Sequence, residues 1–479
     1  MVVGELVQEY DVVVIGGGPG GYHAAIRAAQ LGRSVVIIEK EKLGGVCLHS
    51  GCIPSKVLAA AAAKLHAIRN SSLFGILTGE VEFDLAGLTG HKNKVIEQLH
   101  AGVAALCREN RIEVVYGSAY FLQEDRIAVE SGDHYQVFQY KNAIIATGSS
   151  PAIPEGIICD GEQIFTGRSI TSIQVVPEKL LVYGSNYIAL ETALSFKQFG
   201  ADVTIILDGR KSDFSFDASI NRELERILKK HGIKVVKDAT LQKAMVENEK
   251  VEIFLQTEKE ALNLQGSHLC VSLAPKPNLE ELGLDRIGVE LTEEGYINID
   301  EQCRTSKQNV FAIGDVTSGP PLAVKAIKQG KTAAETIAGQ TAEADLNLLP
   351  MIVHTIPPIA TAGLTEAEAI SEGYEIEASQ FPLATNGYAA IHNQRDGFVK
   401  VVLDKKNDIL LGVHIFGFGA VELISAGTIA MEMAARDEDL TFPHYPHPSV
   451  NEALLEAVEA IKGRAIHLAF PKRKEKVKS

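Results

Sequence analysis

A glycine-rich segment near the N-terminus constrains the fold more than any other feature of the sequence. It follows Val12–Ile15, a continuous β-branched run that is typical of a buried parallel strand. Its glycines fit the spacing G-x-G-x-x-G: Gly16, Gly18 and Gly21. A helical pattern then covers Tyr22–Leu31, and a second apolar run, Ser34–Ile38, ends in Glu39. This order predicts a dinucleotide-binding unit, with a pyrophosphate at the helix N-terminus and the carboxylate on a ribose hydroxyl.

A second unit of the same kind begins at Lys179–Tyr183, where another apolar strand runs into Gly184 and a helical pattern. Its glycine pattern is incomplete, because Asn186 stands where a second glycine would let the backbone approach a pyrophosphate. The acid is displaced too, since Leu207 ends the second strand and Asp208 follows one residue later. We therefore predict a Rossmann-like module here, and weak nucleotide binding by this module stays open.

The choice between the two nicotinamide nucleotides also stays open. An acid after the second strand favours a free ribose hydroxyl, whereas a basic pair favours a 2′-phosphate. The sequence offers both, as Asp208 and then Arg210 and Lys211. Either NAD or NADP therefore suits this module.

Two further strands end in residues suited to a ligand. The strand in Lys141–Gly148 ends in Thr147 and Gly148, and the buried run Val310–Ile313 is soon followed by Asp315. A carboxylate at the carboxyl end of such a strand lies where doubly wound folds bind ligands. We therefore expect Asp315 to lie at a ligand site of this kind.

These patterns predict an α/β protein with two doubly wound, Rossmann-like domains and a C-terminal α+β domain. The length of 479 residues suits about three domains. We expect the first nucleotide domain in residues 1–150 and again in 273–345, with the second inserted at 151–272. Residues 346–479 form the C-terminal α+β domain.

Two cysteines, Cys47 and Cys52, stand with four residues between them. A disulfide needs Cα atoms roughly 4.4–6.8 Å apart, which a regular helix or strand does not give at this spacing, so we expect a distorted loop that Gly51 permits. Pro54 suits a first helical turn, which would place Cys52 at a helix N-terminus, where the dipole and Lys56 favour a thiolate. This arrangement indicates reversible dithiol chemistry. Two unrelated thiols or half of a metal site are the alternatives, although no second cysteine pair nearby completes a zinc set.

A histidine near the C-terminus is a candidate general acid or base. His447 stands between Pro446 and Pro448, which restrict its backbone, and Glu452 follows. The alternatives are an ordinary loop histidine and a capping box between Ser449 and Glu452.

The composition excludes several function classes. A net charge of −15 argues against nucleic acid as a partner. The N-terminus has no basic segment or cleavage site, and we find no apolar run of about 18 residues. We expect a cytoplasmic protein that does not enter a membrane.

Taken together, the motifs resemble those of the flavin-dependent pyridine nucleotide–disulfide oxidoreductases, and within them the dihydrolipoamide dehydrogenases. They run in order along nearly the whole chain: the first glycine turn with Glu39, Gly44–Lys56 with both cysteines, Ala146–Gly148, Tyr187–Glu191, Ala312–Asp315, and His447 with Glu452.

The resemblance implies an enzyme that oxidises protein-bound dihydrolipoyl groups to lipoyl groups through a Cys47–Cys52 redox disulfide, with NAD+ as acceptor. It implies FAD in the first domain, NAD(P) in the second and dimerisation through the third, with a lipoylated carrier protein or lipoyl domain as partner and no metal. The implied flavin site is Gly16, Gly18, Gly21, Glu39, Lys56, Thr147, Gly148 and Asp315. The implied nicotinamide site is Gly184, Tyr187, Glu191 and Asp208.

The resemblance also implies catalytic roles. Cys47 would be the interchange thiol and Cys52 the thiolate against the flavin, with Lys56 paired to Glu191 beside the ring. His447, oriented by Glu452, would be the base and would reach Cys47 of the opposite subunit.

The chain departs from the family pattern at several positions: Val46, His49, Asn186, Leu207, Ala274-Pro275, Val324, Pro358 and Tyr445. We therefore interpret it as a divergent member. A related NADPH-dependent disulfide reductase, or a lipoyl-protein redox partner with a weak nicotinamide site, are the alternatives.

Overall fold

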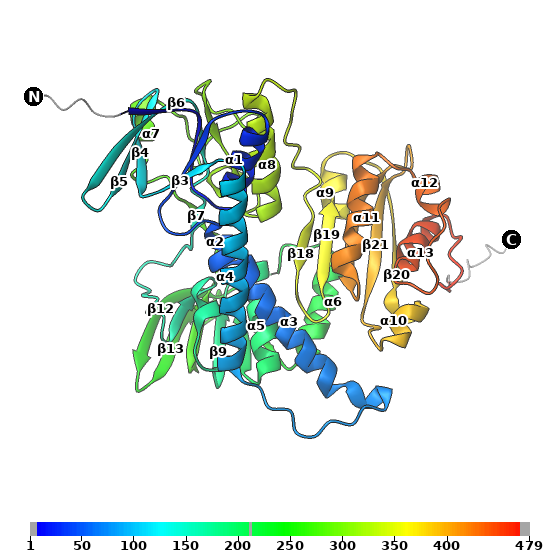
Figure 1. Ribbon diagram of the computed structural model, residues 1–479. Coiled ribbons are helices and arrows are strands. Elements are labelled where there is room, and N and C mark those ends of the chain that lie inside the picture. Colours follow the sequence, from blue (N-terminus) through cyan, green and yellow to red (C-terminus); the bar gives the residue numbers. More distant parts are fainter. Residues whose placement is uncertain (1–6, 210–212, 470–479) are drawn as a thin grey trace, which may run out of the picture. The chain divides into compact units, whose positions relative to one another are not determined.

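The computed structural model describes residues 7–209 and 213–469, and these form two compact units (Figure 1). The first unit comprises residues up to 184, 198–202 and 239–346. The second comprises residues 185–197, 203–238 and those from 347 onwards. The division passes through the helix and the strand that follow Gly184. Arg210 and Lys211 lie outside the described residues.

The first unit is built on a seven-stranded sheet in the order β3-β2-β1-β6-β5-β4, with β17 paired to β6. Strands β1, β2, β3, β6 and β17 are parallel, whereas β4 and β5 form an antiparallel meander with β6. The bounds are β1 (Val7–Ile15), β2 (Val35–Glu39), β3 (Glu113–Tyr116), β4 (Ser118–Gln123), β5 (Arg126–Ser131), β6 (His134–Ile145) and β17 (Val310–Ala312).

The strand register brings the carboxyl ends of the parallel strands to one edge of this sheet. Ile15 pairs with Ile38 of β2 and with Ile145 of β6, and Ala312 of β17 also pairs with Ile145. The residues just after these strands therefore lie side by side, which is where a doubly wound fold binds its ligand.

Helices cover one face of the parallel part of this sheet, and the meander packs on the other. Alternate residues of β1 divide between the two faces: Val12 and Val14 pack with the helices, whereas Val13 and Ile15 pack toward the meander. Helices α1 and α8 lie side by side (Figure 1), and a Cβ on Gly330 would stand 2.5 Å from the Gly20 carbonyl oxygen. The helices and 3₁₀ turns of the unit are α1 (Pro19–Gln30), α2 (Gly45–His49), α3 (Cys52–Arg69), η1 (Ser71–Phe74), α4 (Leu85–Glu109), η2 (Ser169–Ser172), α7 (Leu284–Ile287), η3 (Gly314–Val316) and α8 (Ala323–Ile337).

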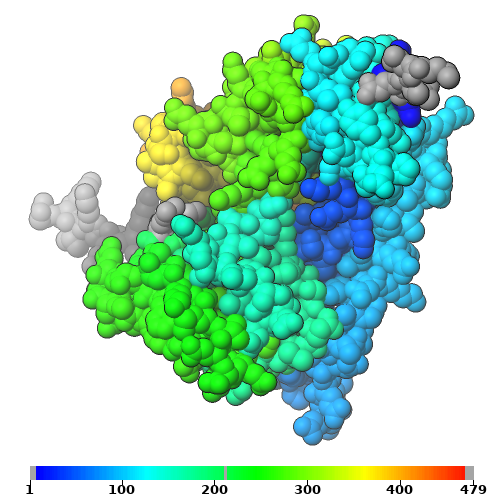
Figure 2. All heavy atoms as spheres, turned by 90° about the vertical axis from the view of Figure 1, so that its left-hand side faces the viewer, coloured from blue at the N-terminus to red at the C-terminus, as the bar shows by residue number. Residues whose placement is uncertain are grey.

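The first unit also holds strands of the second nucleotide module. β15 lies between β8 and β9, and all three are parallel. A three-stranded antiparallel sheet has the order β12-β13-β14. Residues of this part of the chain are green in Figure 2 and are exposed on the face shown there. The bounds are β8 (Ile164–Thr166), β9 (Lys179–Tyr183), β12 (Thr240–Glu247), β13 (Lys250–Gln256), β14 (Ala261–Gly266) and β15 (His268–Val271), with a short pair formed by β7 (Ser149–Ser150) and β16 (Lys276–Pro277).

The second unit is built on a five-stranded antiparallel sheet in the order β18-β19-β22-β21-β20. Its core lies between one face of this sheet and helices α11 and α13. The bounds are β18 (Met351–Val353), β19 (Ile359–Gly363), α9 (Glu366–Ser371), β20 (Ile376–Pro382), η4 (Leu383–Thr385), α10 (Gly387–Ile391), β21 (Gly397–Asp404), β22 (Leu410–Gly417), α11 (Ala420–Glu432), α12 (Asp437–Thr441) and α13 (Glu452–Ile461).

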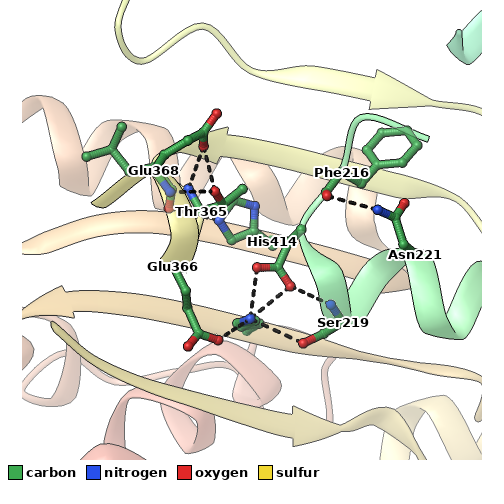
Figure 3. A network of polar contacts seen from close by, with 10 residues as sticks. Phe216, Ser219, Asn221, Thr365, Glu366, Glu368 and His414 are labelled. Atoms are coloured by element: carbon green, nitrogen blue, oxygen red, sulfur yellow. Dashed lines mark hydrogen bonds and ion pairs between the residues drawn. The ribbon is translucent and has the colours of Figure 1, made fainter. Parts of the chain in front are cut away.

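The other face of this sheet carries a buried polar network (Figure 3). Lys400 of β21 points away from the core because its neighbours Val399 and Val401 face it. Its ammonium bonds to Asp217, the N-cap of α6 (Ala218–Lys230). The second unit also holds β11 (Lys234–Val236) and most of α5 (Tyr187–Phe199) and of β10 (Asp202–Ile206), with β10 and β11 parallel.

The sheets confirm the predicted fold class, with parallel nucleotide-module strands followed by an antiparallel α+β region. The exact domain boundaries stay a prediction. The strand expected in Lys141–Gly148 is the end of a longer strand, β6, which begins at His134. Several strands were not predicted, among them β4 and β12–β14.

Among the described residues, one helical stretch, Gly45–Arg69, is long and apolar enough to cross a membrane, with a mean hydropathy of 1.3 over an 18-residue window. No such run was expected from the sequence, because alanines rather than bulky side chains raise the hydropathy here. The stretch consists of α2 and α3, carries both cysteines and packs against α4. One such stretch is weak support for a membrane span.

Candidate active site

The first glycine turn lies between β1 and α1, and its three glycines differ in what surrounds their Cα atoms. Gly16 has φ +102°, and a Cβ there would stand 2.4 Å from the Ala146 carbonyl oxygen. A Cβ on Gly21 would stand 1.9 Å from the Gly16 carbonyl oxygen. A Cβ on Gly18, however, would meet nothing within 4 Å. Gly16 and Gly21 therefore leave no room for a side chain. Gly18 has open space beside it at the N-terminus of α1, as a bound pyrophosphate requires.

Glu39 lies at the carboxyl end of β2, next to this turn. Its Oε2 accepts a hydrogen bond of 2.7 Å from the Gly17 N–H, and its Oε1 accepts one of 2.8 Å from the Glu41 N–H. The carboxylate is thus fixed at the place that the sequence predicted for a ribose contact.

The dithiol segment docks on the same turn. The Gly44 N–H donates to the Gly17 carbonyl oxygen at 2.8 Å, and a Cβ on Gly45 would stand 2.7 Å from Gly18 Cα. Both Gly44 and Gly45 have positive φ, which bends the chain into α2. The segment that carries Cys47 therefore starts against the open glycine.

The two cysteines lie in contact and are in the thiol form. Cys47 is in the short helix α2 and Cys52 begins α3, so the predicted position of Cys52 at a helix N-terminus is confirmed. The pKa of the Cys47 thiol is raised, first by its hydrogen bond with the Cys52 side chain, then by burial and the charge of Cys52. The Cys52 N–H and the charge of Lys56 act in the opposite direction. This pair suits reversible disulfide formation.

Asp315 lies in the 3₁₀ turn η3, directly after β17, and accepts a 2.6 Å hydrogen bond from the Ser149 hydroxyl. The Thr147 hydroxyl donates to the Asn278 carbonyl oxygen at 2.7 Å, and the Asn278 N–H donates to the Gly148 carbonyl oxygen at 2.9 Å. The predicted residues Thr147, Gly148 and Asp315 therefore lie in one connected segment at the carboxyl ends of β6 and β17.

Sequence reasoning missed two buried polar residues behind Asp315, both on α8. Lys325 is fully buried, and its Nζ donates to the carbonyl oxygens of Thr317 and Ser318, each at 3.0 Å. Burial lowers the pKa of Lys325 to about 8, although the charge of Asp315 opposes this shift. The side-chain oxygen of Gln329 accepts from the Gly314 N–H at 2.7 Å. Together they fix the turn that presents Asp315.

The second glycine turn shares one feature with the first. Gly184 has φ +145°, and a Cβ there would stand 1.9 Å from the Ser272 carbonyl oxygen, which is the same kind of close approach as that of Gly16.

The next position of this turn differs, because Asn186 replaces a glycine and caps α5. Its Oδ1 accepts from the Ala189 N–H at 3.0 Å. This bond occupies a helix N-terminal amide that a pyrophosphate would otherwise use. Tyr187 begins α5, and Asp208 follows the buried Leu207.

Glu191 lies on α5 and is almost fully buried. Its Oε1 accepts from the His354 N–H at 2.8 Å, within the second unit. Lys56 belongs to the first unit, and its pairing with Glu191 stays a prediction.

His447 and Glu452 form the predicted pair: His447 Nδ1 lies 2.8 Å from Glu452 Oε1. Glu452 Oε2 accepts from the Ser449 N–H at 2.9 Å. The alternative capping box is only half formed, because α13 begins at Glu452 and the Ser449 hydroxyl has no hydrogen-bond partner among the described residues. Since Nδ1 faces the carboxylate, Nε2 of the exposed His447 is the nitrogen that remains for a substrate.

Models of one protein family match most of the chain. The model described as "Pyridine nucleotide-disulphide oxidoreductase" matches residues 10–330. The model described as "Pyridine nucleotide-disulphide oxidoreductase, dimerisation domain" matches residues 349–458.

Individual proteins are similar over almost their whole length. Dihydrolipoyl dehydrogenase of Geobacillus stearothermophilus is 38% identical over 98% of this chain and 99% of its own. Dihydrolipoyl dehydrogenase 2 of Haloarcula marismortui is 37% identical over 98% of this chain and 100% of its own. The crystal structure of LpdA from Mycobacterium tuberculosis matches with a TM-score of 0.88 and 25% identity, over 95% of this chain and 100% of that one. The flavoprotein disulfide reductase RclA from Escherichia coli shares the fold, with a TM-score of 0.84, 23% identity and the same coverage of both chains.

Proposed function

Because the chain belongs to the pyridine nucleotide-disulphide oxidoreductase family, we propose that it oxidises protein-bound dihydrolipoyl groups to lipoyl groups with NAD+ as acceptor. We propose that it works in the cytoplasm, as a homodimer through its C-terminal domain. Its substrate is a lipoylated carrier protein or lipoyl domain. The relatives named dihydrolipoyl dehydrogenase support this substrate class.

The observation that carries the proposal is the contact between the dithiol segment and the glycine turn. Gly45 abuts Gly18, and Gly44 is hydrogen-bonded to Gly17. The segment that carries Cys47 and Cys52 therefore starts against the turn where a dinucleotide would meet α1. A dithiol so placed suits electron transfer between a disulfide substrate and a bound dinucleotide.

The residues of the first unit suit FAD, because Gly18 leaves open space beside a helix N-terminus and two carboxylates stand at the carboxyl ends of the strands. FAD would be held by Gly16, Gly18, Gly21, Glu39, Lys56, Thr147, Gly148 and Asp315. When bound, FAD supplies the two-electron chemistry that links the dithiol to a nicotinamide. The nicotinamide nucleotide would be held by Gly184, Tyr187, Glu191 and Asp208.

The thiol chemistry belongs to the chain's own residues and starts from the Cys47–Cys52 disulfide. A dihydrolipoyl thiolate attacks Sγ of Cys47, and the S–S bond breaks so that Cys52 leaves as a thiolate. The second lipoyl thiol then loses its proton and attacks the lipoyl sulfur of the mixed disulfide, and Cys47 leaves with the electron pair and takes up a proton. The lipoyl disulfide is formed, and both cysteines are reduced.

His447 supplies the base. Its Nδ1 is held by Glu452, so Nε2 accepts the proton of the attacking lipoyl thiol. The Glu452 carboxylate stabilises the imidazolium that forms. We propose that His447 serves Cys47 of the opposite subunit, so that the dimer is the active form.

An anaerobic absorbance titration with dihydrolipoamide, followed by excess NAD+, tests the proposal. We expect a long-wavelength thiolate–flavin band and then NADH. Cys47→Ser and Cys52→Ser should each abolish dihydrolipoamide oxidation, whereas Cys159→Ser, a partly exposed cysteine elsewhere in the first unit, should leave it unchanged.

The other outcomes separate the alternatives. A band without NADH, followed by NADPH formation on addition of NADP+, would indicate an NADP-dependent disulfide oxidoreductase. A band with no product from either nucleotide would indicate a lipoyl-protein redox partner with a weak nicotinamide site. The absence of any band would contradict the lipoyl substrate.

A further inference from the structure

A second histidine–carboxylate pair stands next to the His447–Glu452 pair, on the same helix. Glu456 follows Glu452 by one helical turn on α13, so the two side chains are neighbours on one side of the helix, with Cβ atoms about 6 Å apart. His467 Nδ1 lies 2.6 Å from Glu456 Oε1. His467 belongs to the segment that returns along α13 after Gly463.

The two pairs are built in the same way. In each, one carboxylate oxygen contacts Nδ1 of a histidine and the other accepts from backbone N–H groups. For Glu456 these are the N–H groups of Ile466, at 2.9 Å, and of His467, at 3.2 Å. The Glu456 side chain is 9% exposed and the His467 side chain 67%. The carboxylate is therefore fixed, while the ring is accessible to a proton from solvent.

Charge links the two pairs. The hydrogen bond and the charge of Glu456 raise the pKa of His467, and the charge of Glu452 adds to this shift. Burial alone would raise the pKa of Glu452, but its bonds to His447 and Ser449 and the charges of His447 and His467 lower it. A protonated His467 thus offsets Glu456, and its loss leaves an extra negative charge one turn from the Glu452 carboxylate.

Other charged groups around α13 have partners of their own or lie farther along the helix. Glu459 lies near Glu456 and Arg464. Burial raises the pKa of Tyr445, and the charge of the Glu459 carboxylate adds to this rise. The elements packed against α13 bring Glu377, paired with Lys462 at 3.1 Å, Lys400, paired with Asp217, and the α12 residues Asp437, Glu438 and Asp439.

We infer that the His467–Glu456 pair is a positioning device for the proposed base, because its two opposite charges cancel beside the Glu452 carboxylate that holds His447. This inference rests on the proposed function, because it assigns a purpose to the basicity of His447. His467 does not touch the substrate in this account, and it acts through Glu452.

Substitutions at the two members of this pair should have opposite effects on His447. His467→Gln leaves Glu456 negative and unbalanced, so the pKa of His447 should rise by about half a pH unit, as expected for one charge several ångströms away at high dielectric. Glu456→Gln removes the negative charge, while its amide oxygen still accepts from the Ile466 and His467 N–H groups. The pKa of His447 should then fall by a similar amount. The double variant should return it close to the wild-type value.

The measurement is an NMR titration of the holoenzyme with ring-labelled histidine, in which the His447 signal is assigned by its loss in His447→Gln. His134→Gln, a change at an exposed histidine of the first unit, is the matched control and should leave the His447 pKa unchanged. Opposite shifts in the single variants, with restoration in the double variant, would support the inference. If the pair only holds the chain in place, both single variants should shift the His447 pKa in the same direction. Shifts of the same sign, or no shift at all, would overturn the inference.

The rate of reduction by dihydrolipoamide, measured against pH in the same variants, tests the consequence for catalysis. Its acid limb should move to higher pH in His467→Gln and to lower pH in Glu456→Gln. The proposed function is tested separately by His447→Gln. A full reduction rate in that variant would contradict the role of His447 as the base, whatever the NMR titration shows.

Discussion

Lys400 and Asp217 form an almost completely buried ion pair, in which the ammonium contacts both carboxylate oxygens. The Lys400 Nζ lies 2.8 Å from Asp217 Oδ1 and 2.9 Å from Oδ2, and the side chains are 4% and 3% exposed. Ser219 and Glu366, labelled in Figure 3, complete the contacts of the ammonium. Asp217 also caps α6 through the Ser219 N–H. The pair thus joins the start of α6 to the antiparallel sheet of the second unit.

Removing one partner of this pair should destabilise the protein strongly, because it leaves a buried charge uncompensated. We expect Lys400→Met to lower the free energy of unfolding by about 3–5 kcal/mol. Asp217→Asn, which keeps the helix cap, should cost less, since Glu366 still neutralises Lys400. Urea denaturation monitored by circular dichroism measures both. Lys405→Met, at an exposed lysine after the same strand, is the control and should change the value by less than about 0.5 kcal/mol. Equal effects at Lys400 and Lys405 would contradict the argument.

The buried Lys325 should make stability depend on alkaline pH. Its folded-state pKa of about 8 lies below the usual lysine pKa of 10.5, so between these values the unfolded chain binds a proton that the folded protein does not. Stability therefore rises with pH across this window. Relative to Lys325→Met, the wild-type protein should gain about 2–3 kcal/mol in unfolding free energy between pH 7.5 and 10.

Urea denaturation of the FAD-saturated protein at several pH values measures this gain. Lys328→Met, at an exposed lysine of the same helix, should show no such pH-dependent difference from wild type. If the two variants respond to pH alike, Lys325 is charged in the folded protein throughout the window.

Local patterns explain how much of the site the sequence could predict. The helix start at Cys52 followed from Gly51 and Pro54, and the turn between β1 and α1 followed from the glycine spacing. The hairpin between β12 and β13 was missed because its two turn residues, Asn248 and Glu249, both have positive φ. Glutamate rarely adopts that conformation, so the sequence carries no clear turn signal there.

Contacts between residues far apart in the chain left no local signal. Lys400 and Asp217 are 183 positions apart, and a lysine within an apolar strand does not identify its partner. His467 returns to Glu456 only after the chain has turned at Gly463, so no short motif joins them. Such pairs depend on how whole elements pack, and the structure was needed to find them.

The open position at Gly18 allows the cofactor contact to be separated from folding. Because a Cβ there would meet nothing within 4 Å, and φ is −67°, we expect Gly18→Val to leave the stability of the apoprotein nearly unchanged. The valine would fill the place of the pyrophosphate, so FAD affinity should fall at least about 100-fold, equivalent to about 2.7 kcal/mol. Calorimetric titration of the apoprotein with FAD measures this.

The control for this experiment is Gly21→Ala, because its Cβ would stand 1.9 Å from the Gly16 carbonyl oxygen. That substitution should lower the stability of the apoprotein itself. Undiminished FAD binding by Gly18→Val would show that the cofactor lies elsewhere.

We expect Asn186 to limit nucleotide binding at the second glycine turn. Its side chain caps α5 through the Ala189 N–H, and its Cβ occupies the position where the family pattern has a glycine that lets backbone approach the pyrophosphate. Asn186→Gly removes both the Cβ and the competing cap at a stability cost of only a few tenths of a kcal/mol. We therefore expect the KM for NAD+ to fall several-fold, with an unchanged rate of flavin reduction by dihydrolipoamide.

Asn186→Ala separates the two effects: it loses the cap, at about 1 kcal/mol, but keeps a Cβ. If crowding by the Cβ limits binding, only the glycine variant improves the KM. If competition for the helix amide limits it, both variants do. An unchanged KM in both would show that Asn186 does not lie against the nucleotide.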